Sequence, residues 1–331
     1  MVFWTAFIVQ CIACTTISLS PQFAYLRKPE GSTYLALMTM PASDIPDLFD
    51  QTALLRNLTG AAAKGNLPGF LDDVATSELI DRFETISRKF SNVAIISHDA
   101  SRMADAVRPR LSEDGTITDI SILAGDRVFL DDPALPAEAF DCIFACPGLE
   151  WANDLPGSLT RLRQALKPDG VLLAAMLGGE SLHELRASWL QAETMMTGGA
   201  SPRVAPFCDV RDAGGLLQRA GFALPVVDTD RLKVRYDNGL ALMKDLKALG
   251  LSNSMAERRR SLVTPGLMAM ACAHYEQNFS DPDNRVRATF QMIYLTGWSP
   301  HESQPKPLRP GSARTRLADA LRVDEKKLPR E

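Results

Sequence analysis

Residues 140–186, FDCIFACPGLEWANDLPGSLTRLRQALKPDGVLLAAMLGGESLHELR, carry the pattern of a β-α-β unit. An apolar run of strand length, 141–146, is followed by Asp154, a good N-cap for a helix. Apolar residues then recur at helical spacing: Leu155, Leu159, Leu162 and Leu166. Residues 168–170, Pro-Asp-Gly, predict a turn, and the near-continuous apolar run 171–177 is typical of a strand buried on both faces. These elements predict a parallel sheet with right-handed crossovers.

The same stretch resembles a known family. The motifs WANDLP, LKPDGVLLAAMLGGESLHELR and, further on, W-x-P-H-E-S-Q resemble class I S-adenosylmethionine (SAM)-dependent methyltransferases, in the branch that includes the mitochondrial complex I assembly factor 5 and its alphaproteobacterial relatives. KPDG alone is common to many methyltransferases, whereas the three motifs together are specific. Residues 198–238 and 288–313 continue the resemblance, which covers roughly 45–315.

The resemblance implies an α/β, Rossmann-like fold with a seven-stranded, mostly parallel, doubly wound sheet and a helical lid. We expect residues 1–44 to be an N-terminal extension outside the fold, 45–303 to form the methyltransferase-like domain and 304–331 to be a flexible tail. Within the domain, 195–280 is expected to supply the lid and a helical insertion. A Gly/Pro-rich segment, 195–207, would lie over the active edge of the sheet.

Composition limits the function classes. The net charge of −4 argues against a nucleic-acid-binding face, which would be basic. The six cysteines form no disulfide or zinc framework, because Cys11-x-x-Cys14 has no second pair and no nearby histidine. We therefore predict reduced thiols and no metal site.

The N-terminus leaves two interpretations open. Residues 1–20 are apolar and uncharged, but lack the basic start of a signal peptide and the arginines of a mitochondrial presequence. They are either an upstream extension, with the natural start at Met38 or Met40, or a membrane anchor. The missing presequence favours a bacterial cytoplasmic protein, with the matrix side of the mitochondrial inner membrane as the alternative. Membrane contact is expected only through a partner.

The cofactor motif is where this sequence departs from the family. In the family, an acidic residue and a glycine-rich turn follow the first strand. Here that stretch, 95–101, reads IISHDAS: it has no glycine, and Ile95 stands at the acidic position. Holding two non-glycine residues in the left-handed conformation would cost about 1–2 kcal/mol each. That cost corresponds to roughly one to three orders of magnitude in affinity.

Candidate site residues follow from the resemblance and from position. Asp131 and Asp132 match an acidic loop that commonly contacts the adenine edge of SAM, or they form a solvated acidic turn. Trp151, after the next strand, either caps the cofactor or packs under the helix. Glu150 beside it replaces the histidine that is usual in relatives.

The remaining candidates belong to loops around the substrate side. Gly178 and Gly179 follow a strand at the ligand edge, and Arg203 in the lid segment would bind an anionic group or remain solvated. Ser181 and Glu184 fit a capping box for the next helix.

Two functional hypotheses follow. The first is a SAM-dependent methyltransferase-like enzyme that acts on a protein, such as a respiratory complex I subunit, by methyl transfer or arginine hydroxylation. The second is a catalytically inactive scaffold or assembly chaperone that keeps the fold and the partner surface. The missing glycines and the altered Ile95 and Glu150 positions favour the second, and the enzyme is the leading hypothesis.

Overall fold

The structure is a computed structural model and describes residues 46–124, 127–128 and 133–305, so the prediction for Asp131 and Asp132 lies outside the described residues. A compact unit extends to Pro300, and 301–305 belong to a second unit. The helices of the first unit are α3 (Gln51–Ala62), α4 (Phe70–Glu84), α5 (Ser101–Val107), α6 (Leu155–Ala165), α7 (His183–Thr197), α8 (Val210–Arg219), α9 (Gly239–Ala248) and α10 (Pro265–Phe279). Its strands are β1 (Phe90–Ser97), β2 (Leu111–Ser121), β3 (Leu123–Ala124), β4 (Arg127–Val128), β5 (Phe140–Ala145), β6 (Leu166–Leu177), β7 (Ala223–Tyr236) and β8 (Val286–Trp298).

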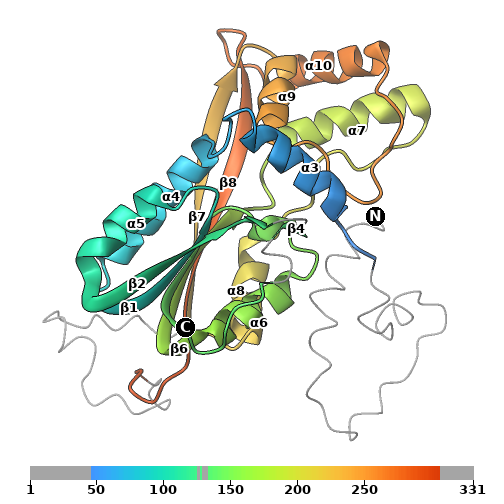
Figure 1. Ribbon diagram of the computed structural model, residues 1–331. Coiled ribbons are helices and arrows are strands. Elements are labelled where there is room, and N and C mark those ends of the chain that lie inside the picture. Colours follow the sequence, from blue (N-terminus) through green and yellow to red (C-terminus); the bar gives the residue numbers. More distant parts are fainter. Residues whose placement is uncertain (1–45, 125–126, 129–132, 306–331) are drawn as a thin grey trace, which may run out of the picture. The chain divides into compact units, whose positions relative to one another are not determined.

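The main sheet has the strand order β2-β1-β5-β6-β8-β7 (Figure 1). Strands β2, β1, β5 and β6 are parallel, whereas β8 runs antiparallel to both β6 and β7. The Rossmann-like α/β prediction is confirmed. The expected strand number differs: among the described residues the main sheet has six strands, and β3 pairs only with β4 in a small separate sheet.

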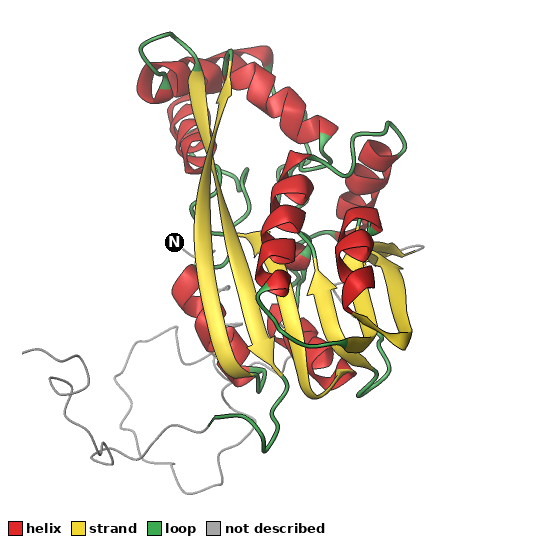
Figure 2. Ribbon diagram, turned by 90° about the vertical axis from the view of Figure 1, so that its left-hand side faces the viewer, coloured by secondary structure: helices red, strands yellow, loops and turns green. Residues whose placement is uncertain are grey.

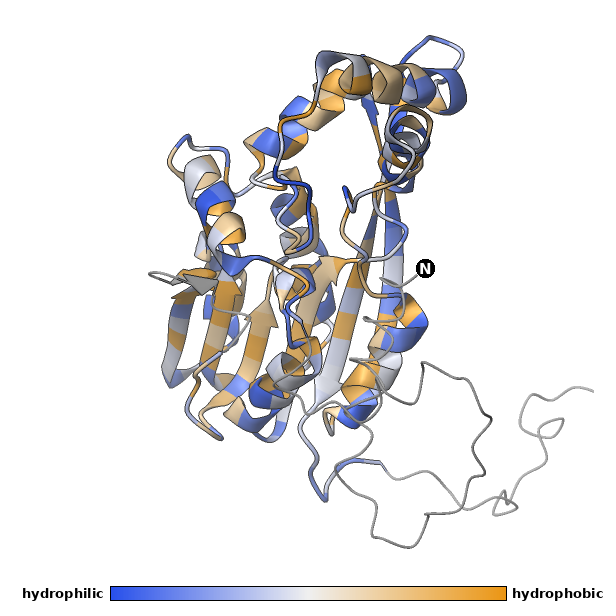
Figure 3. Cartoon of the chain, turned by 90° about the vertical axis from the view of Figure 1, so that its right-hand side faces the viewer, coloured by the Kyte–Doolittle hydropathy of each residue, from blue (hydrophilic) through white to orange (hydrophobic). Residues whose placement is uncertain are grey.

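Helices cover both faces of this sheet because successive residues of the central strands are all buried. Ile143 and Ala145 of β5 pack in one core with α3, α6 and α8. Cys142 and Phe144 pack in the other with α4, α5, α7, α9 and α10. Figure 3 shows apolar residues concentrated on the central strands. The doubly wound arrangement therefore follows from the continuous apolar pattern.

The turn predicted at Pro168-Asp169-Gly170 exists, but inside β6. Phe140 pairs with Leu166 and Cys142 with Val171, so the extra residues bulge out of the ladder. Asp169 takes a left-handed φ of 62° at this bulge. The chain does bend at these residues as predicted, but the bend is a bulge within β6 and does not end the strand.

The two last strands form a ribbon that extends past the parallel sheet. Residues 292–298 of β8 pair with both β6 and β7, while 286–291 pair with β7 alone. Helix α10 contacts α7 and α9 beside this ribbon (Figures 1 and 2). No helix in the described ranges combines the length and the apolar character needed to cross a bilayer.

The capping-box prediction at Ser181 and Glu184 is wrong. Helix α7 begins after Leu182, which has a left-handed φ of 54°. The Glu184 carboxylate is buried and accepts from Thr289 Oγ1 at 2.6 Å and from the Thr289 N–H at 3.2 Å. Ser181 Oγ accepts from the Gln291 N–H at 3.0 Å. Both side chains therefore attach the start of α7 to β8.

Asp141 holds the start of the sheet together and provides a stability test. Its carboxylate accepts from the N–H groups of Ser91 and Asn92, both at 2.7 Å, and pairs with Lys167 at 2.9 Å. Burial opposes ionisation, but Lys167 and the two N–H groups outweigh it and hold the pKa of Asp141 below its usual 3.8.

We predict that Asp141→Asn lowers the free energy of unfolding by about 1–3 kcal/mol at pH 7, measured by urea denaturation. Because the folded pKa lies below the unfolded one, the gap from wild type should shrink as the pH falls below 3.8. Asp114→Asn, at an exposed position of β2, is the control. Equal effects of the two substitutions would contradict this role.

Candidate functional site

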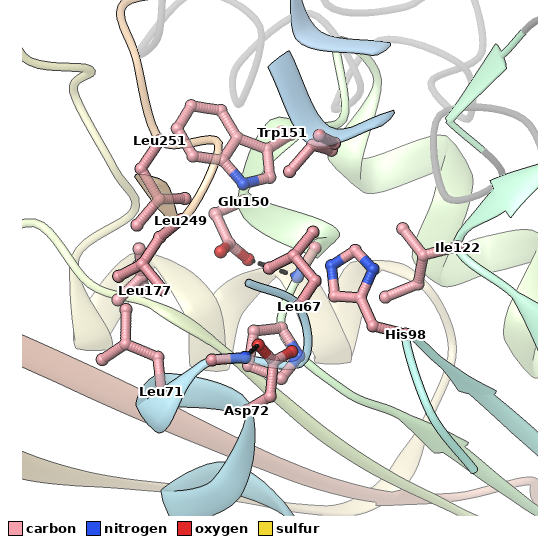
Figure 4. A pocket seen from close by; sticks show the side chains of 14 residues that line it. Leu67, Leu71, Asp72, His98, Ile122, Glu150, Trp151, Leu177, Leu249 and Leu251 are labelled. Carbon is pink, nitrogen blue, oxygen red and sulfur yellow. Dashed lines mark hydrogen bonds between the residues drawn. The ribbon is translucent and has the colours of Figure 1, made fainter. Parts of the chain in front are cut away.

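A pocket, here called the edge pocket, lies at the carboxyl ends of β1, β5 and β6. It has an empty volume of about 490 Å³, including its opening to solvent. Figure 4 shows the Asp72, His98 and Glu150 side chains facing this space from three different segments. The walls are mostly apolar: Leu58, Leu67, Leu71, Ile122, Leu177, Leu249 and Leu251. This is the sheet edge at which ligands of open α/β sheets bind.

Glu150 is the most strongly perturbed group of the edge pocket. It lies in a short 3-10 turn, Leu149–Trp151, that follows Gly148, whose φ of 154° favours glycine. The carboxylate is buried and accepts from the Gly148 N–H at 2.8 Å. Burial among apolar side chains outweighs this hydrogen bond and raises the pKa of Glu150 to about 7.

Asp72 and His98 complete the group of titratable residues. Asp72 is in the first turn of α4, where its Oδ2 accepts from the Gly69 N–H at 2.9 Å. His98 directly follows β1. Burial raises the pKa of Asp72 and lowers that of His98, so both side chains shift towards their neutral forms. A cluster of perturbed groups in a cleft marks a candidate functional site.

Sequence reasoning missed Asp72 and His98 as site members. His98 carried a signal, since it stands directly after the first strand of a parallel sheet. Asp72 carried none, because α4 precedes the sheet in the sequence and reaches the pocket only through tertiary packing.

The loop after β1 lacks the cradle that SAM would need. Among 97–101 no residue has a left-handed φ. Asp99 Oδ1 accepts from the Ser101 N–H at 2.9 Å, and Ile95 is fully buried in the core. His98 projects into the space that a glycine would leave open. The residues present therefore do not fit SAM in the way that the family holds it, and we derive no step through it.

The other predicted residues are divided between two places. Trp151 lines the edge pocket, with its ring edge-on to Phe49 at 5.2 Å and to Phe207 at 5.4 Å. The structure thus shows it packed between other aromatic rings; a role with a cofactor stays a prediction. Phe207 belongs to the expected lid segment, which therefore does reach the neighbourhood of this pocket.

Gly178 and Gly179 allow close approach of the chain to itself. A Cβ on Gly178 would lie 2.5 Å from Gln291 Oε1, and one on Gly179 would lie 3.1 Å from the Phe207 carbonyl oxygen. The Gly179 N–H also donates to the Cys208 carbonyl at 2.9 Å. These contacts explain both glycines, while a role in substrate binding stays a prediction.

Arg203 lines a second, larger cavity, here called the lid cavity, between α7, the lid segment and the start of α8. Its empty volume is about 1370 Å³, including open solvent. The Arg203 guanidinium binds Glu193 Oε1 through Nε at 2.9 Å, and Glu193 also accepts from Ser201. The Arg203 guanidinium also lies 4.8 Å from the ring centre of Trp189. Arg203 is thus paired inside the protein, and Glu193 secures the lid segment to α7.

Known proteins resemble this chain in two groups. A methyltransferase domain family matches residues 85–174. The chain is 36% identical over 266 residues to "Arginine-hydroxylase NDUFAF5, mitochondrial" of Danio rerio, a match that covers 77% of this chain and 83% of that protein. The human protein of the same name is 40% identical over 213 residues, covering 64% of this chain and 60% of its own length.

The second group consists of bacterial methyltransferases. The malonyl-[acyl-carrier protein] O-methyltransferase of Halorhodospira halophila is 37% identical over 163 residues, which cover 49% of this chain and 53% of that protein.

The raised pKa of Glu150 gives a test of the edge pocket. Between the unfolded value of 4.5 and the folded value of about 7, the native state binds a proton that the unfolded state does not. The stability that this proton contributes is therefore lost as the pH rises through that window. We predict that Glu150→Gln does not show this loss of stability with rising pH, because glutamine does not titrate.

Urea unfolding at a series of pH values from 4.5 to 8.5 measures the effect. Relative to Glu150→Gln, the wild type should lose on the order of 3 kcal/mol. Glu113→Gln, at an exposed position of β2, should track the wild type. Parallel pH curves for the wild type and Glu150→Gln would show that Glu150 titrates at its ordinary pKa.

Proposed function

The chain belongs to the methyltransferase-fold enzyme family of the arginine-hydroxylase NDUFAF5, and on that premise we propose that it acts on a protein partner in the assembly of respiratory complex I. The observation that carries this proposal is the alignment, which is 36% identical over 266 residues and extends over 83% of the Danio rerio relative. The location proposed with it is the bacterial cytoplasm, with the matrix side of the mitochondrial inner membrane as the alternative.

The geometry favours a form of this function that does not depend on SAM. The turn after β1 has neither glycine nor left-handed φ, and His98 lines the space beside it. Such changes remove the close backbone approach that the cofactor requires. The fold, the lid segment and the ribbon do not require that turn. An assembly protein that recognises its partner with these elements would tolerate the loss.

A second candidate is a SAM-dependent modifying enzyme. It is favoured by the match of a methyltransferase domain to residues 85–174, which include β1, β5 and most of β6. Relatives are named both as arginine hydroxylases and as O-methyltransferases. In this form the chain would methylate or hydroxylate a partner side chain at the edge pocket.

Calorimetric titration of SAM into the full chain separates the two forms. We predict neither heat nor a shift in melting temperature at millimolar SAM, because no residue of 97–101 provides the cradle. S-adenosylhomocysteine, tested in parallel, should also give none. A dissociation constant in the micromolar range for either would establish the second candidate.

The complex I role itself is tested by deleting the gene in its host. We expect less assembled complex I on native gels, and recovery when the full chain is supplied again. The SAM-independent form further predicts that Glu150→Gln restores assembly as well as the wild type does. Unchanged complex I in the deletion strain would contradict the assembly function, whatever the calorimetry shows.

A further inference from the structure

We propose that the lid cavity is a binding site for a small amphiphilic anion, whose charged group is bound by Arg186 and whose apolar body lies against Trp189, Leu190 and Phe207. The inference concerns a cavity separate from the edge pocket, and it holds with either form of the function proposed above. Its evidence is the contacts of Arg186, the pairing of the neighbouring charges and the lining of the cavity.

Arg186 is a half-buried cation without a counter-ion. It lies in the second turn of α7, and its Nη1 donates to the Gly179 carbonyl at 3.5 Å. Its Nη2 donates to the carbonyls of Ser181 at 3.5 Å and Ala205 at 3.0 Å. In the part of the chain that the structure describes, Arg186 forms no ion pair. A guanidinium has five N–H donors, so two remain for a ligand.

The other charged groups of the lid cavity already have partners or face solvent. Arg203 is paired with Glu193, and Glu180 is paired with Arg231 at 2.6 Å. Asp209 is exposed and caps α8, accepting from the Arg211 N–H at 2.8 Å.

Asp212 is exposed too, so water screens its charge and that of Asp209. Arg186 is therefore the cation that burial leaves uncompensated, and burial also lowers its pKa. A bound oxyanion would supply the missing charge through charge-assisted N–H···O bonds to the donors that remain.

The rest of the cavity suits an apolar body. About 450 Å³ of it can hold water-sized molecules, which lies within the 300–1,000 Å³ that is usual for small-molecule sites. Aromatic and aliphatic side chains make up much of the lining, namely Trp189, Leu190, Val204, Pro206, Phe207 and Met255. Leu190 remains 54% exposed, so part of this apolar surface is in water without a ligand. Covering it with an alkyl chain or a ring would be favourable.

Among the described residues, the lid cavity and the edge pocket share no lining residue, and a smaller hollow between them is lined by residues of both. Phe207 lines the lid cavity and lies edge-on to Trp151, which lines the edge pocket. A ligand in the lid cavity therefore meets the lid segment and α7 rather than Glu150 and His98.

The test compares a charged and a neutral probe of the same length. Decanoate and decanol are titrated into the full chain carrying 8-anilinonaphthalene-1-sulfonate, and displacement of the dye is followed by fluorescence. We expect decanoate to displace the dye at concentrations about tenfold or more below those needed for decanol, because a hydrogen bond to a charged group adds that much affinity. Equal displacement by both probes, or none by either, would overturn the proposal.

Variants then assign the effect to Arg186. Arg186→Met should weaken decanoate about tenfold or more and leave decanol unchanged, whereas Arg186→Lys should keep part of the preference. Arg211→Met removes an exposed cation of α8 near the cavity and should behave like the wild type. If Arg186→Met unfolds, the proposal is still tested by the binding of decanoate and decanol to Arg186→Lys and to the wild type. An unchanged preference for decanoate in a folded Arg186→Met protein would exclude Arg186 as the anion-binding group.

Discussion

Strand β5 has neither of its two faces in contact with water, and much of the architecture follows from that constraint. Cys142 and Phe144 point into one core, and Ile143 and Ala145 into the other. Burying both faces requires helices on both sides, which in turn requires the crossovers that make β1, β5 and β6 parallel. Parallel strands end at a common edge, so the segments that follow them must meet there. The edge pocket is the consequence of this geometry rather than of any single motif.

Local pattern predicted those parts of the fold whose interactions are local. The leucine spacing predicted α6 and the apolar run predicted β6 from neighbouring residues alone. The prediction was wrong for Leu166, which was expected in the helix and is the first residue of β6. The capping-box reading failed because Glu184 is bound by Thr289, a residue 105 positions away. A pattern within a few residues cannot reveal that a distant residue binds the carboxylate in place of the helix terminus. Long-range pairing also accounts for the length of β7, which β8 pairs with continuously from Val226 to Tyr236.

The residues of the candidate site also fall into those that the local sequence predicted and those that only tertiary packing brings together. The sequence placed Trp151 and Glu150 at the ligand edge, since both follow a strand directly. Asp72 came from an earlier helix, and only tertiary packing brings it opposite His98. Loss of the glycines was visible in the sequence, but its consequence was not: the loop is closed by its own Asp99–Ser101 hydrogen bond, and a histidine side chain faces the pocket. Burial raises the pKa values of the carboxyl groups of Asp72 and Glu150.

The two cavities therefore differ in how their charges are balanced. In the edge pocket, carboxyl groups and an imidazole can become neutral by gaining or losing a proton, so burial needs no counter-ion. A guanidinium does not have this option, because arginine stays protonated in proteins. Arg186 must keep its charge while half-buried against carbonyl groups, and its neighbour Arg203 shows the usual solution, a carboxylate within the fold. Both arginines line the lid cavity, but only Arg203 has a carboxylate partner. An anionic ligand would provide the corresponding partner for Arg186.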